Sequence, residues 1–139
     1  MNGHNINVVM CKPNRKAYIT EINTSLESMQ QIVGGLIEPY YLTKDVFLIC
    51  NDEGKIAHFP TNRVIRDENN QIIEIINGTF FIAKDDGDEN EESDGFTSLS
   101  DEEAKYYLEK YLYPDDIFLL GKEVIAFPYY EAEDGSDEQ

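Results

Sequence analysis

Short apolar runs rich in β-branched residues recur along this chain, and residues that favour turns separate them at close intervals. Runs such as Ile6–Cys11, Val46–Asn51 and Val124–Phe127 have the length of strands rather than of helices. Two amphipathic segments of helical spacing interrupt this pattern. The order of elements therefore predicts an α+β fold, a mostly antiparallel sheet built from hairpins with one or two helices packed on it.

Four hairpins are predicted from the turn residues between these runs. One of them, Val46–Asn51 with Lys55–Phe59, is apolar on both faces, so we expect it near the centre of the sheet. The four are Ile6–Cys11 with Ala17–Ile22, Val46–Asn51 with Lys55–Phe59 around Asp52-Glu53-Gly54, Ile72–Ile76 with Thr79–Ala83 around Asn77-Gly78, and Ile117–Leu120 with Val124–Phe127 around Gly121.

Each predicted helix begins at a capping box. Thr24 with Glu27 predicts the start of the first helix, and Gly34-Gly35 predicts its end. The sequence Ser100-Asp101-Glu102-Glu103 predicts the start of the second, which ends before Pro114. Leu36–Leu42 is expected to be a strand, and Pro39 within it indicates an edge or a bend.

The length of 139 residues suits one domain, which we place at residues 1–130, with an acidic loop at 85–95 and an acidic mobile tail at 131–139. No apolar run approaches the roughly 20 residues that span a membrane. The N-terminus lacks the basic and apolar regions of a signal peptide, so we expect a cytoplasmic protein. Cys11 and Cys50 are expected to be reduced and buried, and a disulfide between them is possible only if their two strands are neighbours.

Negative charge is concentrated in the last part of the chain. The net charge is −17, and residues 85–139 hold nineteen Asp and Glu against three Lys and Arg. Residues 1–84 are nearly neutral. This distribution disfavours direct binding to nucleic acid or to an anionic membrane, and it favours a basic partner or solubility alone.

Motifs for catalysis or metal binding are weak. Asp86, Asp88 and Asn90 alternate as in a Ca²⁺ loop, but Glu91 and Thr97 occupy the positions that require Gly and Glu. In the predicted hairpin Cys50 and His58 share a face, but their apolar surroundings would raise the pKa of the thiol. We therefore predict no enzymatic activity, no cofactor and no metal site.

One polar cluster suggests ligand binding. Asn51, Lys55, Asn62 and Arg63 lie around the second hairpin and the loop that follows it, where a guanidinium could bind phosphate or carboxylate. Alternatively, Asn62 caps a turn and Arg63 pairs with an acid such as Asp67.

Four segments, in their order and spacing, resemble a small domain family of unknown function that is carried largely by phages and mobile elements of Gram-positive bacteria. The resemblance covers about residues 5–113 and implies an accessory role in the cytoplasm of the bacterial host, without an established activity. The segments are Leu26–Gly35 (LESMQQIVGG), Ile49–Arg63 (ICNDEGKIAHFPTNR), Gly78–Ile82 (GTFFI) and Phe96–Leu99 (FTSL).

Two functions are compatible with these features. The first is a protein that binds and modulates a basic host protein, for example one that handles nucleic acid or acts in defence, through an acidic surface that imitates DNA. The alternative is a protein that binds or sequesters a nucleotide or signal at the Asn62/Arg63 loop. The acidic surface would consist of Asp85, Asp86, Asp88, Glu89, Glu91, Glu92, Asp94, Asp101 and Glu102.

Overall fold

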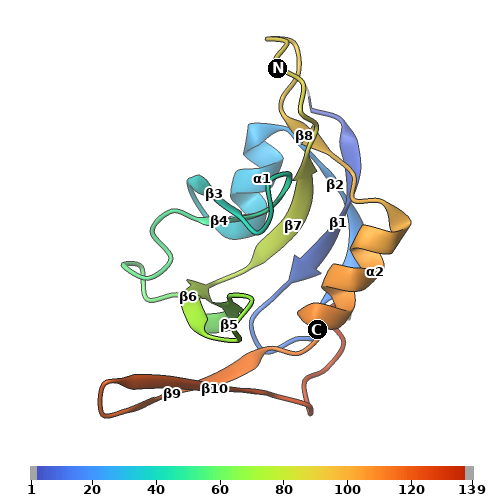
Figure 1. The fold of residues 1–139 in the computed structure, drawn as a ribbon. Coiled ribbons are helices and arrows are strands. Elements are labelled where there is room, and N and C mark those ends of the chain that lie inside the picture. Colours follow the sequence, from blue (N-terminus) through green and yellow to red (C-terminus); the bar gives the residue numbers. More distant parts are fainter. Residues whose placement is uncertain (1–2, 137–139) are drawn as a thin grey trace.

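The computed structural model describes residues 3–136 and confirms a mostly antiparallel α+β fold. Its main sheet has the order β2-β1-β7-β4-β3, and the short strand β8 pairs with β7 (Figure 1). Two further pairs, β5 with β6 and β9 with β10, form separate two-stranded sheets. The strands are β1 (Asn5–Cys11), β2 (Tyr18–Asn23), β3 (Ile37–Tyr41), β4 (Val46–Asn51), β5 (Thr61–Arg66), β6 (Ile72–Asn77), β7 (Phe80–Asp85), β8 (Phe96–Thr97), β9 (Asp115–Leu120) and β10 (Glu123–Pro128).

Strand β7 is the central element of the main sheet. It pairs antiparallel with β1 on one side and with β4 on the other. Phe80 and Ile82 point into one apolar cluster, and Phe81 and Ala83 point into the cluster on the opposite face. All four side chains are fully buried. A strand covered on both faces explains why its sequence is continuously apolar instead of alternating.

One helix covers each face of this sheet (Figure 1). Helix α1 (Leu26–Val33) buries Met29 and Val33 in the cluster around Phe81. Helix α2 (Asp101–Lys110) buries Ala104 and Tyr107 in the other cluster. Neither described helix has the length and apolar character needed to cross a membrane.

The observed helix ends agree with those predicted from the sequence, except at the N-cap of α1. Ser100 and Glu103 form the predicted capping box, and Gly34 ends α1 in the left-handed conformation with φ of +83°. The N-cap of α1 is Ser25, however, whose side chain accepts from the Ser28 amide. The predicted Thr24–Glu27 box is therefore wrong, because the Thr24 side chain is buried and hydrogen-bonds to distant residues.

The predicted hairpin of 46–51 with 55–59 is also wrong. Strand β4 pairs with β3 and β7, while the chain from 52 to 59 folds into consecutive turns. In these turns Ala57 N donates to Glu53 O at 2.8 Å, and Phe59 N donates to Gly54 O at 2.9 Å. The apolar run at 55–59 is thus not a strand, and Ile56 is 77% exposed.

The Asn77-Gly78 turn does not join two paired strands either. Strand β6 pairs with β5, which is connected to it through the polar turn at 67–71. Gly78 has φ of +81°, and its N–H donates to Pro60 O at 2.7 Å. The glycine therefore forms a corner at which the chain leaves one sheet and enters β7 of another.

The first and last predicted hairpins are present. Strands β1 and β2 pair over Asn5–Met10, and β9 and β10 pair from Asp115 to Leu120. As predicted, β3, which contains Pro39, is an edge strand of the main sheet. The β9–β10 hairpin extends away from the rest of the chain, at the opposite end from the acidic loop (Figure 1).

Residues 131–136, the described part of the predicted acidic tail, lie against the turn between β1 and β2. Lys16 N donates to Glu133 O at 2.8 Å, and Arg15 forms an ion pair with the Glu133 carboxylate at 2.7 Å. Ala132 is buried. The end of the predicted tail, 137–139, lies outside the described residues.

Candidate functional site

The four residues predicted to bind a ligand do not form one site. Asn51, at the end of β4, and Lys55, in the turns that follow, line a surface pocket of about 280 Å³. Asn62 and Arg63 belong to β5 and are fully buried. The grouping depended on a hairpin that the chain does not form.

Arg63 forms hydrogen bonds through all five of its N–H groups. Its Nε donates to Tyr111 O at 2.9 Å, and its terminal nitrogens reach four more oxygens. These are Lys12 O at 3.2 Å, Arg15 O at 2.8 Å, Leu112 O at 3.4 Å and the Asn62 side-chain oxygen. A guanidinium carries five donors, so none is left for a ligand.

Arg63 therefore acts as a structural tie, a residue whose hydrogen bonds hold separate segments of the chain together. It joins β5 to the β1–β2 turn and to the end of α2, three segments far apart in sequence. Asn62 extends the tie, because its Nδ2 donates to Cys11 O and to Gly78 O, both at 2.9 Å. The alternative pairing of Arg63 with Asp67 is not found, because backbone carbonyls take that place.

The pocket that contains Asn51 and Lys55 is lined mainly by acidic and apolar side chains. Lys55 forms an ion pair with Glu74, which lowers the pKa of that carboxyl despite its partial burial. A hydrogen bond with Asp52, together with burial, raises the pKa of Glu38. Lys55, the single cation that lines the pocket, is thus already paired. The surrounding carboxylates disfavour an anionic ligand.

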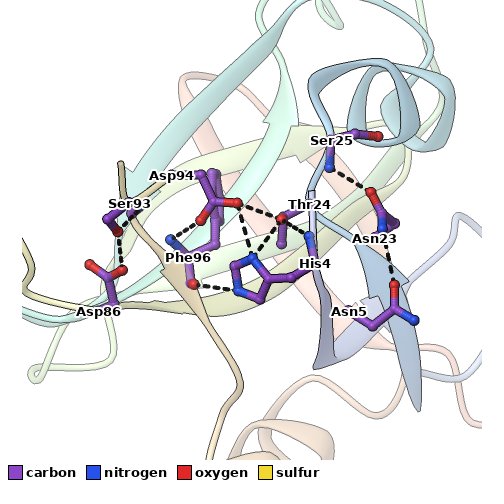
Figure 2. Close-up of polar contacts among 10 residues, drawn as sticks. His4, Asn5, Asn23, Thr24, Ser25, Asp86, Ser93, Asp94 and Phe96 are labelled. Atoms are coloured by element: carbon purple, nitrogen blue, oxygen red, sulfur yellow. Dashed lines mark hydrogen bonds and ion pairs between the residues drawn. The ribbon is translucent and has the colours of Figure 1, made fainter. Parts of the chain in front are cut away.

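The acidic loop, residues 85–95, has a defined conformation held by its own side chains, and Figure 2 shows two of these contacts, Ser93 with Asp86 and the Phe96 amide with Asp94. Successive side-chain oxygens accept amide hydrogens two residues further on, as in Asx turns. The donors and acceptors are Gly87 N to Asp85, Asp88 N to Asp86, Asn90 N to Asp88, Glu92 N to Asn90, Gly95 N to Ser93 and Phe96 N to Asp94.

A polar contact attaches this loop to the start of the chain. The Asp94 carboxylate accepts the Thr24 hydroxyl at 2.5 Å and lies 3.2 Å from His4 Nδ1 (Figure 2). The second ring nitrogen of His4 lies 3.1 Å from Phe96 O. Thr24 is 3% exposed, so its hydroxyl needs these partners. Sequence gave no signal for this network, because its members lie far apart along the chain.

The predicted acidic surface is thereby presented by an anchored loop. Asp86, Asp88, Glu89, Glu91 and Glu92 are all exposed. Hydrogen bonds from the Ser93 hydroxyl and the Asp88 amide lower the pKa of Asp86, so this carboxylate is charged at neutral pH. Asp85 and Asp94 are partly buried, and Asp101 and Glu102 are exposed in the first turn of α2.

Cys50 and His58, the predicted thiol–imidazole pair, do not share a hairpin face. Cys50 lies in β4 and is buried, whereas His58 is exposed in a turn with φ of +60°. Burial raises the pKa of the Cys50 thiol from 9.0 to about 11. This thiol is therefore protonated at neutral pH and is a poor nucleophile.

Both cysteines are free and buried, as expected from the sequence. Strand β7 lies between β1, which contains Cys11, and β4, which contains Cys50. Burial also raises the pKa of Cys11, from 9.0 to about 11. Among the described residues, no three His, Cys, Asp or Glu side chains are placed to hold a metal ion.

The raised pKa of Cys11 predicts a loss of stability in alkali. Above pH 9.0 the unfolded thiol loses its proton while the folded thiol keeps it until about pH 11. The folded state then binds more protons, so the free energy of unfolding falls across this window, by on the order of 2 to 3 kcal/mol at most from this group. Urea unfolding followed by circular dichroism at increasing pH measures the slope. An unchanged slope in Cys11→Ala would contradict the assignment.

Comparison with known families gives one match. The model of a domain of unknown function, DUF3846, matches residues 6–112, from the second residue of β1 to just beyond the end of α2. No curated protein and no solved structure was found to match the chain. The match covers well over half of the sequence, and the chain therefore belongs to the DUF3846 family of domains of unknown function.

Proposed function

We propose that this protein is a non-enzymatic accessory protein that binds a basic, nucleic-acid-handling protein through its acidic loop, where it takes the place of DNA. The main observation that supports this proposal is that hydrogen bonds within the loop, and from the loop to Thr24, hold its charged residues in a defined conformation, unlike those of a simple solvated tail. A fixed array of charges can match the phosphate-binding groove of a partner without a large cost in conformational entropy.

The charge density of the loop supports this proposal. Seven of the ten residues from 85 to 94 are Asp or Glu. The loop leaves from β7 and returns as β8, which pairs with β7, so its two limbs start side by side. Limbs of about five residues reach at most roughly 17 Å, which gives about one charge per 2–3 Å. Duplex DNA carries about one per 1.7 Å.

The surroundings of the loop leave this charge largely uncompensated. Among the described residues, Lys84 at the end of β7 is a cation that already pairs with Asp45 and Glu103, and the imidazole of His4 contacts Asp94. The adjacent first turn of α2 adds three more carboxylates, of which Glu103 has a pKa lowered chiefly by the Ser100 amide. A basic partner would therefore meet the acidic loop and a second group of carboxylates at the start of α2.

The setting that we propose is the cytoplasm of a bacterial host, with the gene carried by a phage or another mobile element. The resemblance noted in the sequence supports this setting. The same resemblance gives no activity of its own, which is why the proposed role depends on the loop.

A pull-down from host lysate, eluted with increasing salt, tests the proposal. We expect capture of a protein that handles DNA or RNA, released at moderate salt because charge contacts are screened there. Eluted fractions are identified by mass spectrometry. Capture of no such protein, or release that does not depend on salt, would contradict the proposal.

The alternative, binding of a nucleotide or signal at the Asn62/Arg63 loop, has less support. Arg63 has no free N–H group, and the neighbouring pocket is acidic. The absorbance of the purified protein at the wavelength of nucleobases tests this alternative directly, because a bound nucleotide would copurify.

A further inference from the structure

The β9–β10 hairpin exposes an apolar surface that the rest of the fold does not cover. Phe118 is 51% exposed, Leu119 73%, Leu120 62% and Phe127 58%. Register places Phe118, Leu120 and Phe127 on one face, with Leu119 on the other. The hairpin lies after residue 112, beyond the part that matches the family model. We call the β9–β10 hairpin the arm.

The base of the arm is firmly attached to the domain. The Asp115 carboxylate accepts the Val64 amide at 2.9 Å, and Arg66 donates to Ala126 O at 3.2 Å. Tyr129 N donates to Pro114 O at 2.7 Å. The outer half has no comparable contacts among the described residues, and a bare two-stranded hairpin is only marginally stable in water. The arm therefore needs a cover.

One edge of β9 is open. Within the described residues β9 pairs with β10 alone, and its run Ile117–Leu120 contains no charge and no proline to protect that edge. Strand β10, by contrast, begins with Glu123 and ends with Pro128, which has no N–H to donate. The open edge of β9 is thus the better template for another strand.

This edge is complementary to itself. If two copies of β9 pair antiparallel about Leu119, Phe118 of each copy faces Leu120 of the other. The same register brings Lys122, in the turn, next to Asp116 of the second copy, and this happens twice by symmetry. Apolar groups then meet at the centre, and opposite charges meet at both ends.

The charge of the whole chain also favours this arrangement over others. Two molecules with a net charge of −17 repel each other strongly over most of their surfaces. Residues 117–127 are an exception, because they carry one Lys and one Glu. The arm and the acidic loop lie at opposite ends of the molecule (Figure 1), so contact through the arms keeps the acidic loops far apart.

We propose that the arm joins two copies of this chain into a symmetric dimer by antiparallel pairing of β9 with β9. The two acidic loops then lie at the outer ends of the dimer and are free to bind.

Sedimentation equilibrium of the full chain across the micromolar range tests the proposal. We expect the mass of two chains for the natural sequence and of one chain for Leu119→Asp, which places two carboxylates at the centre of the contact. Leu26→Asp is the matched control, because Leu26 is also exposed, at 56%, and begins α1, which lies away from the arm in Figure 1, so this variant should remain dimeric.

Charge reversal tests the register. Asp116→Lys and Lys122→Asp should each weaken the dimer about 10-fold, since each brings like charges together. An equimolar mixture of the two variants, and the double variant, should recover the natural affinity. Circular dichroism confirms that each variant is folded.

Three results would overturn the proposal. They are a monomer throughout the range, a dimer that persists in Leu119→Asp, and a monomeric chain that loses a lysate partner only when the arm is substituted. The last would assign the arm to a different protein.

Discussion

Replacing Arg63 by alanine is expected to unfold the domain or to destabilise it by about 4 kcal/mol or more, since hydrogen bonds from charged groups contribute about 1.5–3 kcal/mol each. The guanidinium is fully buried and donates to five oxygens. Its removal leaves these oxygens without their donors and opens a cavity between β5, the β1–β2 turn and the end of α2. Urea unfolding followed by circular dichroism measures the loss.

Two further variants separate this role from a general effect of charge. Arg63→Lys keeps the charge but offers a single nitrogen in place of the planar fork, so it should lose most of the same stability. Arg66→Ala removes a partly exposed arginine that bonds to Asn70 O and Ala126 O, and it should cost far less. A stable Arg63→Ala protein that had lost ligand binding would instead favour the nucleotide alternative.

Neutralising the acidic surface is expected to abolish most partner binding while leaving the fold intact. The variant replaces acids whose carboxylates have no hydrogen-bond partner among the described residues, so the Asx turns are kept. At about 0.5 kcal/mol for each exposed pair, five lost pairs weaken binding about 50- to 100-fold. The substitutions are Glu89→Gln, Glu91→Gln, Glu92→Gln, Asp101→Asn and Glu102→Gln.

A matched variant controls for net charge. It changes five exposed acids elsewhere by the same total charge and should bind the partner with nearly natural affinity. Affinity is measured by titration calorimetry at two salt concentrations. Equal losses of affinity in the two variants would show that binding depends on total net charge and not on the acidic surface. The control substitutions are Glu53→Gln, Glu68→Gln, Glu109→Gln, Glu123→Gln and Glu131→Gln.

Local sequence signals predicted the local structure well. The Ser100–Glu103 capping box, the Gly34 helix end and the β9–β10 hairpin all depend on residues a few positions apart. The same is true of the α+β class, since apolar runs of strand length identify strands whatever their partners are. The physical cause of each of these features is contained within one segment.

Strand pairing was harder because it is decided by distant segments. Asn77-Gly78 has the composition of a hairpin turn, yet β7 pairs with β1 and β4, which leaves β6 to pair with β5. Both faces of β7 are apolar, and only the centre of the large sheet buries them both. Tertiary burial thus outweighs the preference of the turn.

The candidate site shows the same division. The sequence identified the acidic segment, because composition alone reveals it. It also selected Arg63 and Asn62 as unusual, but assigned them to a ligand, since the carbonyls that they bind come from residues about fifty positions away. The contact of Thr24 and His4 with Asp94 was missed for the same reason.

Competition with DNA tests the central claim most directly. Short duplex DNA is titrated into the complex of this protein with the captured partner, and the remaining complex is measured by fluorescence anisotropy. If the acidic loop takes the place of DNA, the duplex should displace the protein completely. The variant with five neutralised acids in the acidic surface should be displaced at a lower concentration of DNA. A ternary complex, in which the partner holds DNA and this protein at once, would contradict the account.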